Sequence, residues 1–531
     1  MTAHSSRPLL AALLVGALAA TSLGQNPFQP GFRWAHGAEL NTPWIPTRVD
    51  FGADGEWVWV GAEGGNPRLL LFAGAETGVP QPVLGDLSVA GSAGILGTLA
   101  GPDPRQLFTL AQYPEPDAFN RRTVVTRHDP LSAVAGGSFT PTWSYPLPFT
   151  ANGPARFAIS EDASVVVVAA LENAPPFVRV ERLDGQTGAS LGFRDFPALA
   201  LNALALSADG RRVALCLEQR LIIMDEFGST LHDEVLPSTA GAMALDAAGD
   251  RLLVAQAGAM RVYDWSGAAY QLTVTQIGPA NEVVTKLAIA SDGSAYCASW
   301  WRAVGTDRVR HEVYEGATHT RVNHIVQEGF ANGLQNAPVD AVFSADGTRV
   351  AVASWGRGDA LPEVLLLELG VAQPVMEIDL PGSAMAIDLD REGTRIAVVT
   401  KNLHANQFGT TGEVRLYDTG ERDLQLLSPA RVGGTLALAS QHAGASTALF
   451  LIGTRSASPL SVPGVLGELH LDRRRRMYIY ARAADSTGRA DLTIPLPNQP
   501  ALIGLPLSAQ AASRVAGQLV LSETVVDPVF H

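Results

Sequence analysis

The chain has 531 residues, of which 47% are hydrophobic and 17% charged, and its formal net charge is −14 at pH 7. Nucleic acids and acidic membrane surfaces attract basic proteins, so this acidic chain excludes a general role on either of them. The length exceeds the usual size of one compact domain and predicts two domains.

The first residues have the three parts of an export signal. Arg7 precedes an apolar run over residues 9–20, which is followed by small residues before Gln25. This order of a positive charge, a hydrophobic stretch and a cleavage zone is typical of secretory signal peptides. We therefore expect residues 1–24 to be a signal peptide and the protein to be exported, as a periplasmic, extracellular or cell-surface associated product. No later apolar run approaches the roughly 20 residues of a membrane-spanning helix, so no transmembrane segment is predicted.

One short pattern recurs about eight times between residues 50 and 400: an apolar strand, a turn built on Asp-Gly or an equivalent, and a second apolar strand. The copies lie near residues 51–55, 95–105, 157–163, 204–210, 243–250, 287–293, 342–347 and 385–393. A spacing of about 40 to 58 residues, without a helical pattern between copies, is typical of four-stranded propeller blades. The pattern predicts an all-β, eight-bladed β-propeller. A seven-bladed ring is the alternative, because the second copy has Gly101-Pro-Asp-Pro-Arg105 instead of an Asp-Gly turn.

Aspartate-glycine pairs mark the turns of several copies. They are Asp54-Gly55, Asp209-Gly210, Asp292-Gly293 and Asp346-Gly347. Glycine supplies the positive φ that a tight hairpin needs, so the repetition of this pair at equivalent turns indicates a geometric role and not a catalytic one.

The two ends of the repeat complement each other. The last copy stops after a third strand that ends at Tyr417-Asp418, and a strand without a partner precedes the first copy at residues 32–36. Pairing of this early strand with the final blade would bury two edges that otherwise stay open to aggregation. We expect the ring to be closed in this way.

Several copies turn on Asp-Gly and end in Tyr-Asp, as at Tyr263-Asp264 and Tyr417-Asp418. In these features the chain resembles the WD-repeat and YVTN-type β-propeller superfamily, over roughly residues 30 to 420. The Gly-His and Trp-Asp pairs of true WD repeats are missing, so the resemblance implies the propeller fold alone. We expect the propeller domain to span residues 25–425.

The repeat is lost after about residue 426. Short strands bounded by Gly, Pro and Asn follow and predict a small β-sandwich over residues 426–531. The segments Ile494-Pro-Leu-Pro-Asn498, Ala501-Leu-Ile-Gly504 and Ser508-Ala-Gln510 resemble a C-terminal module of large exported bacterial proteins. That resemblance implies attachment or sorting. The arginine run at residues 473–476 is expected to be the solvated end of a hairpin.

We expect a ligand to bind on the face of the ring opposite the Asp-Gly turns. Loops between the second and third strands emerge there, and the long ones span residues 112–120, 300–307, 355–359 and 401–408. Long loops on a rigid scaffold are where binding residues gather. The candidate ligand-binding residues are Tyr113, Trp300, Trp301, Arg302, Trp355, Arg357, Asp359, His404 and Asn406. Tryptophans suit stacking on sugars or packing against a protein, and the alternative is that they close the tops of adjacent blades.

No motif identifies a catalytic site. Phosphate-binding and dinucleotide-binding glycine loops, a nucleophile elbow and zinc-type Cys or His spacings are all missing from the sequence. We therefore predict no catalytic residue and no metal site, and the cofactor stays unassigned. Cys216 and Cys297 lie in strands of different blades, so we expect two buried free thiols.

The sequence favours an exported recognition module that binds a protein, a glycan or a cell-envelope component through its long-loop face. One alternative is a propeller enzyme, either a quinoprotein-type dehydrogenase or a lactonase-like hydrolase, for which Glu172, Asn173, Asn202 and His404 are available. A second alternative is a structural surface or matrix component. Carboxylates and histidines converging on the central channel around a cation would favour an enzyme, and an apolar or closed channel would favour recognition.

Overall fold

The structure is a computed structural model that describes most of the chain from residue 32 to residue 526. Outside the description, besides the two termini, lie residues 38–44, 53–54, 56, 64–67, 74–80, 83–93, 104, 115–120, 130–139, 151–153, 174, 303–306, 330–335, 357–360, 405–410, 420–423, 428–431, 443–444, 467, 486–487, 500–506 and 516. The predicted signal peptide therefore lies outside the described residues.

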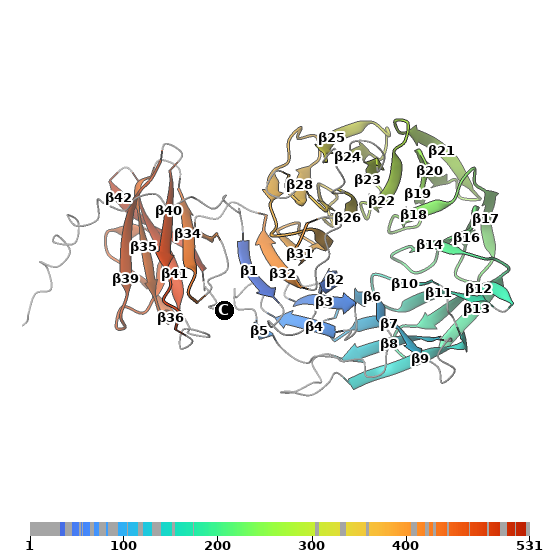
Figure 1. Cartoon of the computed structure of the whole chain (residues 1–531), viewed down its shortest axis with the longest axis horizontal. Coiled ribbons are helices and arrows are strands. Elements are labelled where there is room, and N and C mark those ends of the chain that lie inside the picture. Colours follow the sequence, from blue (N-terminus) through green and yellow to red (C-terminus); the bar gives the residue numbers. More distant parts are fainter. Residues whose placement is uncertain are drawn as a thin grey trace, which may run out of the picture. The chain divides into compact units, whose positions relative to one another are not determined.

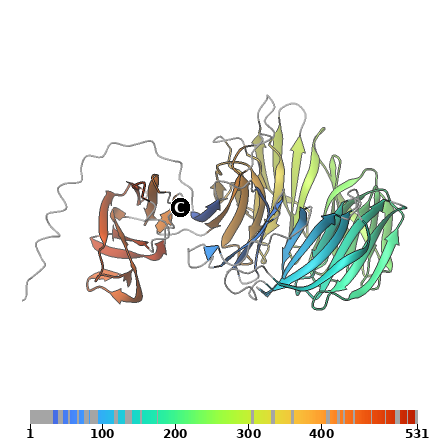
Figure 2. The ribbon, with the colours of Figure 1, turned by 60° about the horizontal axis from the view of Figure 1, so that its bottom comes forward.

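The chain divides into two compact units, one spanning Arg33–Gly420 and one formed by the chain from Glu421 onward. In the described part of the first unit, every element is a β-strand, and the strands form eight four-stranded antiparallel sheets. These sheets follow one another around a common axis (Figure 1) and stack face to face (Figure 2), which is the arrangement of a β-propeller. The first seven sheets in chain order are β2 (Ile45–Phe51), β3 (Trp57–Glu63), β4 (Arg68–Ala73) and β5 (Gln81–Pro82); β6 (Gly94–Ala100), β7 (Leu107–Pro114), β8 (Arg121–Asp129) and β9 (Thr140–Thr150); β10 (Ala155–Ile159), β11 (Val165–Asn173), β12 (Pro176–Asp184) and β13 (Ser190–Phe196); β14 (Leu201–Leu206), β15 (Val213–Leu217), β16 (Arg220–Met224) and β17 (Thr230–Val235); β18 (Ala240–Leu245), β19 (Arg251–Gln256), β20 (Ala259–Trp265) and β21 (Tyr270–Ile277); β22 (Val283–Ile289), β23 (Ala295–Arg302), β24 (Arg308–Glu315) and β25 (Arg321–Glu328); and β26 (Pro338–Phe343), β27 (Arg349–Ser354), β28 (Val364–Glu368) and β29 (Met376–Ile378).

The eighth sheet joins the two ends of this unit. It consists of β30 (Ala384–Leu389), β31 (Arg395–Lys401), β32 (Gly412–Asp418) and, beside β32, the early strand β1 (Phe32–Gly37). The predicted pairing of the early strand with the last copy of the repeat is thus confirmed by the strand order. The eighth sheet also packs against β2 and β3 of the first sheet, through a shared core that includes Val49, Val60, Val399 and Leu416.

Each sheet has two distinct ends. Turns between first and second strands lie at one end, which we call the turn end, and the antiparallel order places the loops between second and third strands at the opposite, loop end. At the turn end Gly210, Gly293 and Gly347 have φ of 71°, 69° and 67°. The neighbouring aspartates accept hydrogen bonds from the turn, as when Asp346 Oδ1 accepts from Thr348 N at 3.0 Å. The expected geometric role of the Asp-Gly pairs agrees with these contacts.

Arginines at the start of second strands connect four of the eight sheets to the next sheet at the turn end. Arg212 donates to the carbonyl oxygen of Gly249 at 2.7 Å, and Arg251 donates to that of Gly293 at 2.8 Å. Two further arginines repeat the contact: Arg349 with Gly393 O at 3.2 Å and Arg395 with Gly55 O at 2.8 Å. The last of these links the eighth sheet to the first. We call these four contacts the arginine seam.

The core of the first unit lies between neighbouring sheets. Second strands are apolar on both faces because each is covered on both sides, and all five residues of β15 are buried. Cys216 and Cys297 are free and buried, as predicted, and burial raises the pKa of the Cys297 thiol to about 12. Both thiols therefore act as small core side chains.

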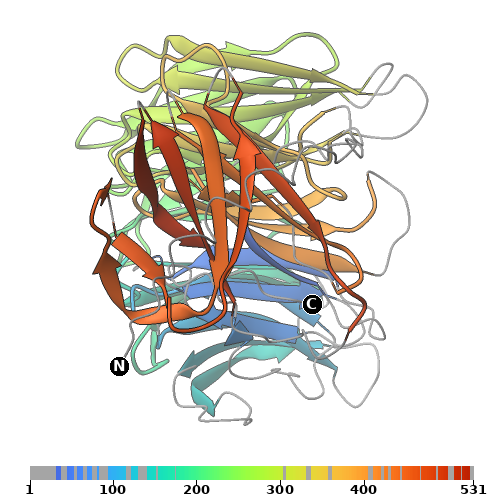
Figure 3. The same cartoon turned by 90° about the vertical axis from the view of Figure 1, so that its left-hand side faces the viewer.

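The second unit is also built of strands (Figure 3). One sheet has the order β33 (Leu424–Leu426), β34 (Thr435–Gln441) and β40 (Arg489–Pro495); a second has the order β37 (Val465–Leu466), β42 (Gln518–Val526), β41 (Ser508–Val515), β35 (Ala445–Gly453) and β39 (Tyr478–Ala483); and β36 (Arg455–Ser461) pairs with β38 (Glu468–Leu471). Leu451, Leu471 and Leu521 belong to its core. The arginine run at residues 473–476 is exposed, as expected, but it lies between β38 and β39, which belong to different sheets and form no hairpin with each other.

Candidate functional site

The first strands of all eight sheets line a cavity of about 560 Å³, which therefore lies on the axis of the ring. We call it the chamber. Its lining is charged as well as apolar. The charged side chains are Arg48, Asp50, Arg156, Lys286, Asp340 and Asp388.

The charges occupy equivalent positions of different sheets. Arg48, Arg156, Lys286 and Asp340 each stand three residues before the end of their first strand, where they pair with Gly61, Ala169, Ser299 and Ala353 of the second strands. The same position of the other four sheets holds Gly97, Ala203, Ala242 and Ala386. One level of the repeat thus carries charged side chains on four sheets and very small ones on the other four. This choice leaves space on the axis and surrounds it with charge.

The carboxyl groups gather on three consecutive sheets. Asp388 Oδ2 accepts a hydrogen bond from Phe51 N at 2.6 Å, Asp50 Oδ2 accepts one from Thr98 Oγ1 at 3.4 Å, and Asp340 Oδ1 accepts one from Ala341 N at 3.0 Å. Burial raises the pKa of all three carboxyls, that of Asp50 to about 7. The nearby Asp50 raises the pKa of Asp388 further, because two like charges do not ionise easily together.

The cations face the water of the chamber. Arg48 and Arg156 are both exposed, although they belong to the innermost strands, and Lys286 is half-buried. Arg48 lies close enough to Arg156 to lower the pKa of that guanidinium, after the larger effect of burial. Among the described residues, neither Arg156 nor Lys286 takes part in an ion pair, and Arg156 donates only to the adjacent Ala155 O at 3.1 Å.

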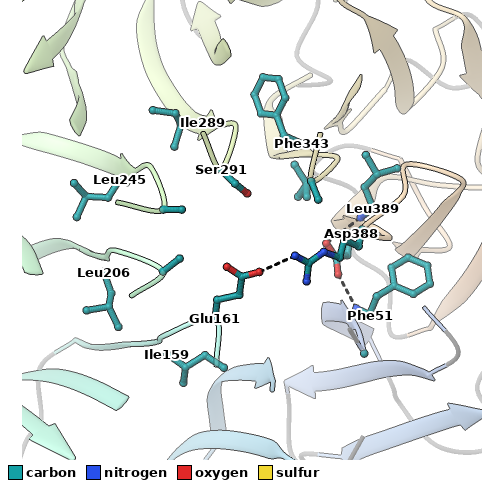
Figure 4. Close-up of a pocket in the computed structure, with 16 residues that line it drawn as sticks. Phe51, Ile159, Glu161, Leu206, Leu245, Ile289, Ser291, Phe343, Asp388 and Leu389 are labelled. Carbon is teal, nitrogen blue, oxygen red and sulfur yellow. Dashed lines mark hydrogen bonds and ion pairs between the residues drawn. The ribbon is translucent and has the colours of Figure 1, made fainter. Parts of the chain in front are cut away.

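A second cavity, of about 450 Å³, lies at the turn end of the axis (Figure 4). It shares Val342 and Asp388 with the chamber, so the two cavities are neighbours. Apolar side chains at strand ends surround it: Phe51, Ile159, Leu206, Leu245, Ile289, Phe343 and Leu389. Glu161 and Arg391, from sheets that are not adjacent, form an ion pair of 3.2 Å across the opening. Hydrogen bonds from one turn to the next complete this end, such as Ala247 N to Ser291 O at 2.8 Å.

At the loop end, several candidate residues lie on three consecutive sheets. Trp301 and Arg302 end β23, Trp355 follows β27, and His404 follows β31. All four are half-buried. Arg302 lies 3.7 Å from Glu328 in an ion pair. We call this set the loop-end arc.

The other candidate residues fall elsewhere. Trp300 is 1% exposed and packs under the guanidinium of Arg310, so it belongs to the core and supports packing at this position. Tyr113 is half-buried near the end of β7, with the β2–β5 sheet between it and the arc. Arg357, Asp359 and Asn406 lie outside the described residues.

A buried glutamate supports the loop-end arc. Glu363, which precedes β28, accepts a hydrogen bond from Leu380 N at 2.6 Å and lies 3.3 Å from His404 Nδ1. Burial raises the pKa of Glu363 to about 7, although His404 acts in the opposite direction. A side chain at Gly356, where φ is +73°, would collide with Glu363. The glycine therefore allows the chain after Trp355 to pass directly over this carboxyl group.

Two histidines of the β22–β25 sheet bond to different partners. His311 and His319 bond separately, to Ser299 at 2.8 Å and to Tyr296 at 3.1 Å. In the part of the chain that the structure describes, no group of three or more His, Cys, Asp or Glu side chains is arranged to hold a metal ion. That part also contains no helix with the length and apolar character needed to cross a membrane.

Sequence reasoning did not find the chamber residues or Glu363. The signal for the chamber was present, because the position three residues before the end of each first strand is either charged or very small. Glu363 carried a weaker signal, a single acid directly before the apolar run Val364-Leu-Leu-Leu367.

Comparisons with known proteins give structural likenesses only. No model of a known protein family matches the chain, and no curated protein sequence matches it. The structure of Chaetomium thermophilum Sqt1 bound to the N-terminus of the ribosomal protein L10 is 14% identical, covers 74% of this chain and 100% of that one, and has a TM-score of 0.49. Kuenenia stuttgartiensis hydrazine synthase is 16% identical, covers 46% of this chain and 75% of that one, and has a TM-score of 0.34. Neither likeness carries an argument about function, and the fold assignment depends on the sheets described above.

Proposed function

We propose that the protein is an exported β-propeller recognition module that binds a protein, a glycan or a cell-envelope component at its loop end. In this proposal residues 1–24 are a signal peptide, residues 25–425 form an eight-bladed ring, and residues 426–531 form a β-sandwich that tethers or presents it. The ring belongs with the YVTN-type propellers of exported proteins.

The observation that carries the proposal is the loop-end arc. Three consecutive sheets end in Trp301 with Arg302, Trp355 and His404, all half-buried at one end of a rigid scaffold. Tryptophan and arginine dominate the binding energy of many interfaces, since each offers a large surface and a polar group. The partly exposed indoles can stack on a sugar or pack against a peptide, and the nearby charges can orient the ligand.

Binding to defined probes tests the recognition site. We would offer the purified protein a displayed random-peptide library and a panel of soluble neutral and acidic polysaccharides. We expect at least one selected ligand whose affinity falls about tenfold or more in Trp301→Ala and Trp355→Ala. Phe227→Ala is the matched control, because Phe227 is 84% exposed but lies in the turn after β16, at the other end of its sheet. Equal affinity of all variants, with folding intact by circular dichroism, would contradict the proposed site.

Export has its own measurement. Expression of the full chain in a Gram-negative host should yield protein outside the cytoplasm, with an N-terminus near Gln25 by sequencing. Recovery of an unprocessed chain from the cytoplasm alone would contradict export.

A further inference from the structure

The chamber has the size of a small-molecule site. Ligand pockets are usually about 300 to 1,000 Å³, and the chamber measures about 560 Å³. Its walls are inner strands that are held by hydrogen bonds to second strands and by packing between sheets. A site on such walls is largely formed before a ligand arrives, so little binding energy is lost to ordering.

Two of the three chamber cations, Arg156 and Lys286, are not neutralised by an ion pair in the described part of the chain. The chamber carboxyls of Asp50, Asp340 and Asp388 accept hydrogen bonds from backbone N–H groups or from Thr98 instead. Lys286 is half-buried, and a charged group that loses part of its water is normally paired, since burial without a partner is costly. The arrangement thus leaves room for a ligand that supplies the negative charge.

The balance of charge at neutral pH also favours an anion. Burial raises the pKa of Asp50, Asp340 and Asp388, that of Asp50 to about 7, and so disfavours the negative charge of these carboxyls. Asp50 is therefore only partly ionised at neutral pH, although Arg48 lies near it, and Lys286 lies near Asp340. The proximity of Arg48 to Arg156 adds repulsion that a bound anion would relieve.

We propose that the chamber binds a small ligand with an oxyanion group, a carboxylate or a phosphate, held by the guanidinium groups of Arg48 and Arg156 and by the ammonium group of Lys286. Guanidinium forks match the planar carboxylate and the phosphate edge with two parallel hydrogen bonds. Lys286 adds a compact charge from the far side of the ring, because β22 lies three sheets from β10 and β2 lies two sheets from β10 in the other direction. This site is separate from the loop-end arc.

Three sugars that share the glucose ring and differ in their anionic group would show which oxyanion the chamber binds. Binding of glucose 6-phosphate, glucuronate and glucose to the full chain would be measured by isothermal titration calorimetry at constant ionic strength in chloride. We expect at least one of the two anionic sugars to bind and glucose not to bind. Glucose 6-phosphate alone would assign a phosphate ligand, glucuronate alone a carboxylate ligand, and both together the shared oxyanion. Equal binding of glucose, or no binding by either anion, would overturn the proposal.

Variants locate the site. Arg156→Gln and Lys286→Gln should each weaken anion binding about tenfold, because each removes a charged hydrogen-bond donor. Arg211→Gln is the matched control, since the Arg211 side chain is 70% exposed at the turn end. If Arg156→Gln does not fold, Arg156→Lys replaces it, with a smaller loss that reflects the missing fork. Unchanged affinity in these variants would overturn the proposal. Trp301→Ala should leave anion binding intact. The proposed anion site in the chamber and the proposed ligand site at the loop end can therefore be refuted independently.

Discussion

The turn end and the loop end of the ring differ in how closely they follow the repeat. At the turn end, glycines with positive φ recur from sheet to sheet, and the arginine seam repeats one contact four times. At the loop end, the residues after the second strands differ in every sheet. Trp301 with Arg302, Trp355 and His404 occupy comparable places in three neighbours.

This contrast separates stability from the proposed recognition within a single repeat. Identical contacts around the turn end connect neighbouring sheets in the same way, which is what a ring of stacked sheets needs. Unequal side chains at the loop end contribute little to that pattern and are free to suit a ligand. The chamber combines both, because its backbone follows the repeat and its side chains depart from it.

Deletion of β1 should reduce stability more than any other change proposed here, because it opens the ring itself. Deletion of residues 1–37 leaves β32 without its neighbour and exposes a strand edge. We expect a loss of roughly 3–5 kcal/mol in the free energy of unfolding and a tendency to aggregate. Urea denaturation and size-exclusion chromatography would measure both. Deletion of residues 1–31, which keeps β1, is the control, and equal midpoints for the two deletions would refute closure by this strand.

The arginine seam should contribute less, and only at the turn end. Arg395→Ala removes a charged donor to Gly55 O in the first sheet. We expect a cost of about 1.5–3 kcal/mol in chemical denaturation, the usual range for a hydrogen bond with a charged group. Arg211→Ala changes another arginine of this end, 70% exposed, and should be nearly neutral. A similar loss in the free energy of unfolding for both substitutions would show that the arginine seam contributes no more to stability than an exposed arginine does.

A substitution at the chamber residue Asp50 should have the smallest effect on the free energy of unfolding, and this effect should depend on pH. Burial raises the pKa of Asp50 to about 7 in the folded protein, so the folded state binds this proton more tightly than the unfolded state. The resulting stabilisation is complete at acid pH, below the unfolded pKa, and is lost as the pH rises through about 7. Asp50→Asn has no proton to lose.

Urea midpoints at pH 5 and pH 8 would measure this difference. Relative to the wild type, Asp50→Asn should gain about 1–2 kcal/mol between the two conditions. The control is Asp292→Asn, because hydrogen bonds from Ser294 lower the pKa of this turn carboxyl, which stays ionised over the whole range. A difference between wild type and Asp50→Asn that does not change with pH would contradict the assignment.

Much of the ring could be predicted from the sequence because its signals are local. The Asp-Gly turns, the apolar second strands and the early strand at residues 32–37 all depend on a few adjacent residues, and the structure has them as expected. The contacts of the turn-end arginines were not predicted from the sequence. The structure gives four of these arginines a contact in the next sheet, and the partner lies 37 to 44 residues away in the sequence for three of them and 340 residues away for Arg395.

The chamber and part of the candidate site could not be predicted in the same way. Which position of an inner strand faces the axis depends on the tilt and bulge of that strand, and seven of the eight first strands shift register where the chamber begins. Trp300 and Trp301 are adjacent in sequence, but the strand β23 continues to Arg302 and alternation sends Trp300 into the core. Loop length alone did not reveal that continuation.

The closing strand also bears on how the molecule is made. Synthesis delivers β1 first and its neighbour β32 almost last, with nearly the whole ring between them in the sequence. A nascent chain therefore cannot close the ring until residue 418 has left the ribosome. Contacts between residues so far apart in the sequence also form slowly. In the export that we propose for this protein, the same delay would keep the ring open until the synthesis of the precursor is nearly complete.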